Sequence, residues 1–130
     1  MTELPDWSSE ELEKIYLVSR LVARGEIDTE KAAVKLAGIL KNRPQSNVIY
    51  FSMYAHMING RVFKQSGGDR MILYFLRRIA QDSGAGTLSR ALDAVYGYSG
   101  FRGSLGCYVE DLESACAALK YEYGLAGKPK

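Results

Sequence analysis

Apolar residues recur every three or four positions along six stretches of this chain, a spacing that places them on one side of an α-helix. The first stretch spans Ser8 to Arg24, and the other five are marked by their apolar sets: Ala33, Leu36, Ala37 and Leu40; Tyr50, Met53, Tyr54 and Met57; Ile72, Phe75, Leu76 and Ile79; Leu88, Ala91, Leu92 and Val95; Leu112, Ala115, Cys116 and Leu119. The spacing predicts an all-α fold, a compact bundle of five or six helices.

Helix-capping residues support this interpretation at several of the expected starts. Ser8 and Glu11 form a capping box, and Trp7 is placed to pack on Leu12 as a hydrophobic staple. Asp28 or Thr29 can begin the second helix and Asp69 the fourth. The third is expected from Ser46, although its NVIYF run would also suit a strand; no partner strand is evident nearby.

A chain of 130 residues without repeats or long linkers fits a single helical domain over 1–130, with a short flexible tail at about 125–130. The acidic start lacks the basic and apolar regions of a secretory signal, and no apolar run approaches the length of a membrane span. Two cysteines make neither a disulfide framework nor a zinc-binding pattern. We therefore expect a cytoplasmic protein that does not enter membranes and carries no metal or cofactor.

Charge is distributed unevenly along the chain. Residues 1–30 contain three basic and eight acidic side chains, a net charge of −5; residues 31–90 contain ten and two, or +8; residues 91–130 contain four and five, or −1. The basic middle suits a nucleic acid or an acidic protein as partner. The alternative is that the acidic first segment neutralises it within the fold.

The stretch 97–108 has glycine at 97, 100, 103 and 106, and glycine is a poor helix former. We therefore expect a flexible glycine-rich loop before the last helix. Its Tyr98, Phe101 and Arg102 are residue types common at protein interfaces, and we assign them to partner binding. In the alternative interpretation, Tyr98 and Phe101 fold back as a lid on the helical core.

A second surface is expected on the helix at 70–81. Arg70, Tyr74 and Arg77 share the side opposite its apolar stripe, where they could contact a protein or neutralise phosphates and stack on bases. The alternative is an ordinary solvated helix face.

The third expected helix is apolar nearly all round, which predicts a homodimer through Tyr50, Met53, Tyr54 and Met57. If the chain is a monomer, this helix must instead lie at the centre of its own core.

Catalysis is not indicated. The single histidine, His56, belongs to no recognisable nucleophile motif, and paired carboxylates fall in first turns of helices, where they stabilise the helix dipole. The sequence therefore favours a non-enzymatic protein-binding regulator or adaptor that acts through a helical surface and the 97–108 loop. The alternative is a nucleic-acid-binding protein that uses the basic face at 70–81.

Overall fold

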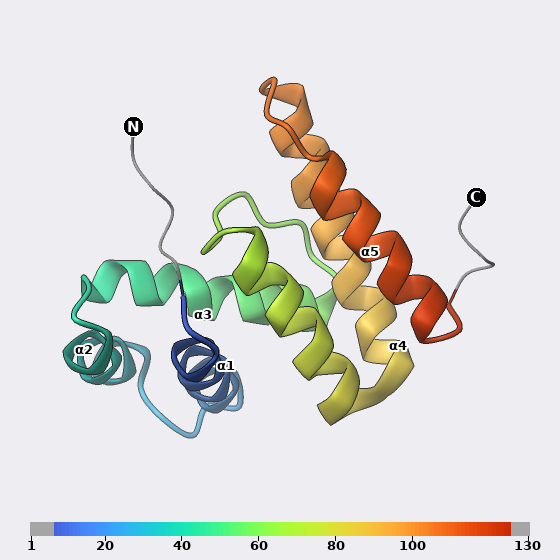
Figure 1. The fold of residues 1–130 in the computed structure, drawn as a ribbon. Helices are drawn as coiled ribbons and strands as arrows, with labels where there is room; N and C mark the ends of the chain where they lie inside the picture. The colour runs from blue at the N-terminus through green and yellow to red at the C-terminus, as the bar shows by residue number, and fades with distance from the viewer. Residues whose placement is uncertain (1–6, 126–130) are drawn as a thin grey trace. The chain divides into compact units, whose positions relative to one another are not determined.

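The computed structural model describes residues 7–125, which form five α-helices and no strand. The helices are α1 (Ser9–Ala23), α2 (Thr29–Leu40), α3 (Pro44–Asn59), α4 (Asp69–Ser104) and α5 (Glu110–Glu122) (Figure 1). The all-α prediction is therefore confirmed. None of these helices is both long and apolar enough to cross a membrane.

Contacts within the chain group into two units, and each is described by itself. Unit 1 contains residues 7–55 and Gln65–Ile72, and unit 2 contains His56–Lys64 and residues 73–125. The single-domain assignment remains a prediction. The expected tail falls almost wholly outside the described residues, as does the start of the acidic first segment.

The first helix begins as its sequence predicts. The Ser8 hydroxyl accepts a hydrogen bond from the Glu11 amide at 3.1 Å, and the Ser8 amide donates to the Glu11 carboxylate at 2.9 Å. These bonds from Ser8 lower the pKa of the Glu11 carboxyl. Both staple residues, Trp7 and Leu12, are buried, and the Trp7 indole donates to the Gly67 carbonyl oxygen at 3.3 Å. Local capping and burial thus fix the start of α1 together.

Asn47 holds α2 and α3 together in unit 1. It is fully buried, and its side-chain amide donates to the Ala33 carbonyl oxygen in α2 at 3.0 Å while exchanging hydrogen bonds with the Asn42 side chain. Asp28 is the N-cap of α2, as the sequence allows. α3 starts at Pro44 and not at Ser46, because proline suits the first helical position, where no amide donor is needed.

The four α3 residues assigned to the homodimer are buried within the chain. Tyr54 meets Tyr16 of α1 edge-on at 5.5 Å between ring centroids, and Tyr50 meets Trp7 at 5.8 Å. Exposure is only 7%, 1%, 5% and 0% for Tyr50, Met53, Tyr54 and Met57. The homodimer assigned to these four residues therefore loses its basis, because the expected exposed surface is part of the core.

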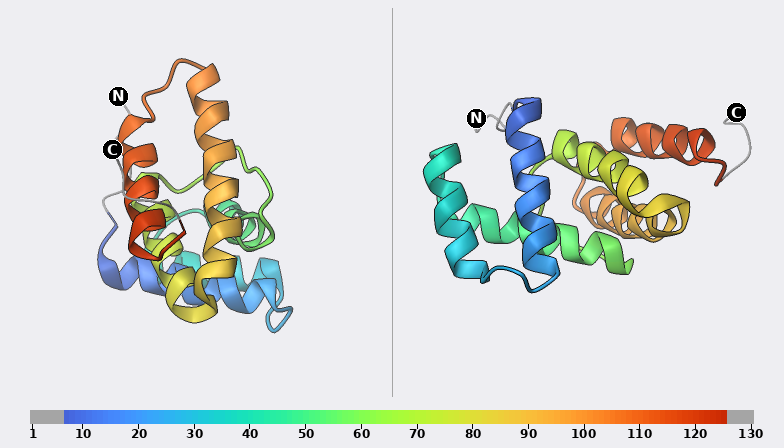
Figure 2. Two further views of the ribbon diagram at one scale, coloured as in Figure 1. Left: turned by 90° about the vertical axis from the view of Figure 1, so that its right-hand side faces the viewer. Right: turned by 90° about the horizontal axis from the view of Figure 1, so that it is seen from below.

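Two helices predicted separately, from Asp69 and after Thr87, are joined as α4. They meet at Gly84, whose backbone (φ 83°, ψ −177°) is not helical and is accessible almost only to glycine. We call residues 69–83 the first limb of α4 and residues 85–104 the second limb. Figures 1 and 2 show the sharp corner between the limbs, and α5 running back beside the second limb.

The glycine-rich stretch is where the sequence prediction was wrong. Residues 97–104 continue the second limb of α4, and only the short turn 105–109 separates it from α5. Gly106 is the one glycine of the four with positive φ, at 80°. Glycine's poor helix propensity costs about 1 kcal/mol per residue, and packing against the rest of unit 2 outweighs it.

Candidate functional site

The segment Arg61–Lys64, which leaves α3, crosses the second limb of α4, and we call it the strap. Val62 lies against Gly97, and Phe63 stacks on Tyr98 with ring centroids 4.8 Å apart and planes inclined by 17°. The Lys64 ammonium lies 5.2 Å from the centroid of the Phe101 ring. Successive strap residues thus contact successive positions along one part of α4.

Gly97 permits this crossing. A β-carbon built on Gly97 would overlap Val62 Cγ2 and would lie 3.1 Å from Val62 Cβ and Cγ1. Valine is branched at Cβ and has little rotamer freedom with which to move aside. The absence of a side chain at Gly97 therefore serves close packing of the strap.

The three residues predicted to bind from the 97–108 loop lie on the helix in different environments. Tyr98 is buried under Phe63, with 6% exposure, so it is not displayed to a partner; its burial matches the lid alternative, but it lies on a helix and not on a loop that folds back. Phe101 is half-buried beside Lys64, and Arg102 is exposed. Phe101 and Arg102 remain available to a partner.

The apolar side of α4 continues beyond the end of the strap. Tyr98, Phe101 and Leu105 follow one another at helical spacing, and the Leu105 amide still donates to the Arg102 carbonyl oxygen at 3.1 Å. Exposure rises along this row from 6% at Tyr98 to 63% at Leu105. The row therefore begins in the core and ends as an uncovered apolar edge.

Both the strap and the end of α4 carry positive charge. Arg61, Lys64 and Arg102 are all exposed, and none forms an ion pair with a carboxylate of residues 7–125. We define the strap surface as the exposed or half-buried residues of both segments: Arg61, Val62, Lys64, Phe101, Arg102 and Leu105.

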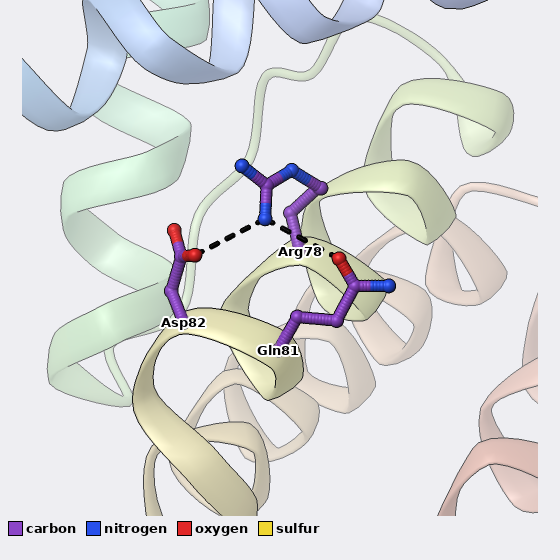
Figure 3. A network of polar contacts seen from close by, with 3 residues as sticks. All are labelled: Arg78, Gln81 and Asp82. Atoms are coloured by element: carbon purple, nitrogen blue, oxygen red, sulfur yellow. Dashed lines mark hydrogen bonds and ion pairs between the residues drawn. The ribbon is translucent and has the colours of Figure 1, made fainter.

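Three other arginines of unit 2 bind groups of the chain itself through their guanidinium groups. Arg77 pairs with Glu122 of α5 at 3.2 Å, and Arg90 donates to the Ile58 carbonyl oxygen at the end of α3 at 3.3 Å. Arg78 donates to Asp82 at 3.1 Å and to Gln81 at 3.3 Å, just before the Gly84 corner (Figure 3). These contacts occupy the guanidinium groups within the fold.

The second predicted surface is not assembled as one described site. Arg70 lies in unit 1, whereas Tyr74 and Arg77 lie in unit 2. Arg77 is exposed but paired with Glu122, and Tyr74 is half-buried. The proposed role of these three residues remains a prediction.

Hollows occur in unit 1. One, of about 550 Å³, is an open depression lined by Ile27, Glu30, Lys31, Val34 and Lys35. Another, of about 280 Å³, is lined by Val22, Ala23, Thr29, Val48, Phe51, Ser52 and Ala55, with only two hydroxyls among its side-chain polar groups. Neither lining contains a nucleophile beside a histidine or a cluster of acidic groups, the arrangement that acid–base or nucleophilic chemistry requires.

Residues 7–125 contain no cluster of three or more histidine, cysteine or acidic side chains arranged to hold a metal ion. Cys107 and Cys116 are free thiols, and Cys116 is buried as its place in the apolar stripe predicts.

Sequence reasoning missed the strap, of which Val62 and Lys64 belong to the surface. No local pattern marks these residues, because their contacts are with residues more than thirty positions away. One signal was present in α4: the stripe ending at Val95 continues through Tyr98, Phe101 and Leu105, despite the intervening glycines.

No protein-family model matches this chain, and the comparisons with curated proteins and with solved structures find no match either.

Proposed function

We propose that this chain is a non-enzymatic, protein-binding regulator or adaptor that engages its partner through the strap surface. The observation that carries the proposal is the apolar row of α4, which continues past its cover to Phe101 and Leu105 and has Arg102 and Lys64 beside it. Aromatic and arginine side chains at a partly covered apolar edge are typical of the residues that dominate binding energy at protein interfaces.

The helical conformation of this region strengthens the proposal. A flexible loop would lose conformational entropy when a partner ordered it, whereas residues already held in a helix lose less. Phe101 belongs to α4, and the Lys64 ammonium lies beside its ring. The surface is therefore preorganised, which favours affinity.

The alternative is a nucleic-acid-binding protein that uses the basic face at 70–81. Its support is weaker, because Arg77 and Arg78 already pair with carboxylates of the chain. A cytoplasmic location is part of our proposal, since free thiols suit a reducing compartment.

Site-specific photo-cross-linking tests the proposal in the native cell. A photoreactive amino acid at Leu105, which is 63% exposed, should capture a distinct protein, while the same amino acid at the exposed Ala118 of α5 should not. Equal capture from both positions, or capture of nucleic acid alone, would contradict it.

The double variant Phe101→Ala/Arg102→Ala gives the quantitative test. If either residue is a hot spot, binding of the captured partner should weaken by about 2 kcal/mol or more, with little change in melting temperature. The matched control is Val34→Ala/Lys35→Ala, which also removes an apolar group and a cation from neighbouring exposed positions of a helix. Normal binding by a double variant that melts far lower would make Phe101 and Arg102 structural residues.

A further inference from the structure

The cations of the strap surface differ from three other arginines of unit 2 in having no carboxylate or carbonyl partner among residues 7–125 for their charged groups. Arg77 and Arg78 are neutralised by carboxylates, and Arg90 is held by a helix end. Arg61, Lys64 and Arg102 have no carboxylate partner among the residues described. Three cations without a carboxylate partner among the described residues thus belong to the strap surface.

Acidic residues are absent from both segments that build this surface. The strap has none, and α4 and the following turn have none from Ala94 to Val109. The flanking acids are Asp93, one turn before Gly97, and Glu110, Asp111 and Glu113, in the first turn of α5. No acidic residue therefore stands between Phe101, Arg102 and Leu105 along the chain.

The cations are also placed beside apolar groups, so a ligand must satisfy both. Lys64 lies over the Phe101 ring at 5.2 Å, a cation–π contact that holds its ammonium at the edge of the apolar row. Val62 is 53% and Leu105 63% exposed on the two segments. A β-carbon on Gly100 would meet no atom within 4 Å, so the α4 backbone is open to close approach there.

Resting on the proposed function, we infer that the partner contributes an acidic amphipathic segment to the strap surface. Its apolar side chains cover Phe101, Leu105 and Val62, and its carboxylates pair with Lys64, Arg102 and Arg61. Charge complementarity of this kind chiefly sets specificity and the rate of association. A nucleic acid would satisfy the cations but would leave the aliphatic Val62 and Leu105 without an apolar partner.

Fluorescence anisotropy with defined probes tests this inference. The first probe is a labelled helical peptide with leucine at helical spacing and glutamate at the flanking positions; the second has glutamine in place of every glutamate; the third is a single-stranded DNA oligonucleotide. We expect the glutamate peptide to bind at least tenfold more tightly than the glutamine peptide at low salt, and to weaken as salt is raised. The DNA should bind more weakly than the glutamate peptide.

Charge-reversal variants test whether the preference for the glutamate peptide arises at the strap surface. Lys64→Glu/Arg102→Glu should abolish the preference for the glutamate peptide, whereas the control Lys31→Glu/Lys35→Glu on α2 should keep it. Circular dichroism checks that each variant is folded. If charge reversal disturbs the fold, Lys64→Gln/Arg102→Gln replaces it, and this variant should reduce the preference for the glutamate peptide severalfold.

The inference of an acidic partner segment would be overturned by any of three results: equal affinity for both peptides, no binding of either peptide, or tighter binding of the DNA. If the Leu105 cross-link still yields a protein in that case, the proposed function stands and only the partner's chemistry is wrong. If the cross-link also yields no protein, both fail.

Discussion

Gly97 and Gly100 lie one turn apart on α4, and changing each to alanine should move stability in opposite directions. Alanine is favoured over glycine inside a helix by roughly 1 kcal/mol. At Gly100 the new β-carbon meets no atom within 4 Å, so Gly100→Ala should raise the free energy of unfolding by up to about 1 kcal/mol.

Gly97→Ala gains the same helix preference, but its β-carbon would overlap the Val62 side chain, with Val62 Cβ itself 3.1 Å away. Forcing an extra methyl group into a packed site costs about 1–3 kcal/mol. The two variants should therefore differ by about 1–3 kcal/mol, with Gly97→Ala the less stable.

Urea unfolding followed by circular dichroism measures this difference, provided that the denaturant slopes agree among the variants. Val62→Ala should recover part of the loss in the double variant, with a coupling energy of about 1 kcal/mol, because the two residues are in contact. If Gly97→Ala stabilises the protein as much as Gly100→Ala does, the strap does not pack on α4 as described, and the strap surface is wrong with it.

Two further predictions concern buried polar groups. The Ser99 hydroxyl is buried without a hydrogen-bond partner among residues 7–125. Ser99→Ala should therefore leave the free energy of unfolding unchanged or raise it by up to about 1 kcal/mol. If urea unfolding shows instead that the variant is less stable by more than about 1 kcal/mol, the hydroxyl has a hydrogen-bond partner. Burial raises the pKa of Tyr50, so the folded chain keeps this proton at pH values where the unfolded chain has lost it. Its contribution is therefore complete below about pH 10 and is lost as pH rises; Tyr50→Phe should show a shallower loss of stability above that pH, and an unchanged pH profile would count against this assignment.

The helices were predictable because their signals are local. The capping box at Ser8, the N-cap at Asp28 and the apolar stripes each depend on residues within one or two turns. The start of the fourth expected helix at Asp69 was likewise confirmed.

The strap surface was only half predictable, because it depends on contacts between distant segments. Phe101 and Arg102 were identified by residue type, but Gly97 was interpreted as a helix breaker when its role is to admit Val62. Helix propensity depends only on the residue and its own helix. At Gly97 the preference for alanine is reversed by Val62, which is distant in the sequence. The same limit applies to the dimer predicted from the apolar third helix: the sequence does not show that Tyr16 of α1 covers Tyr54.

The chain passes between its two units after Ala55, after Lys64 and after Ile72, so each unit is built from separate pieces. The first crossing lies inside α3 and the third inside α4. A recombination event at any single point would therefore carry away part of the other unit or divide a helix. Neither unit is one continuous stretch of sequence, so neither can be transplanted into another protein as a single uninterrupted fragment.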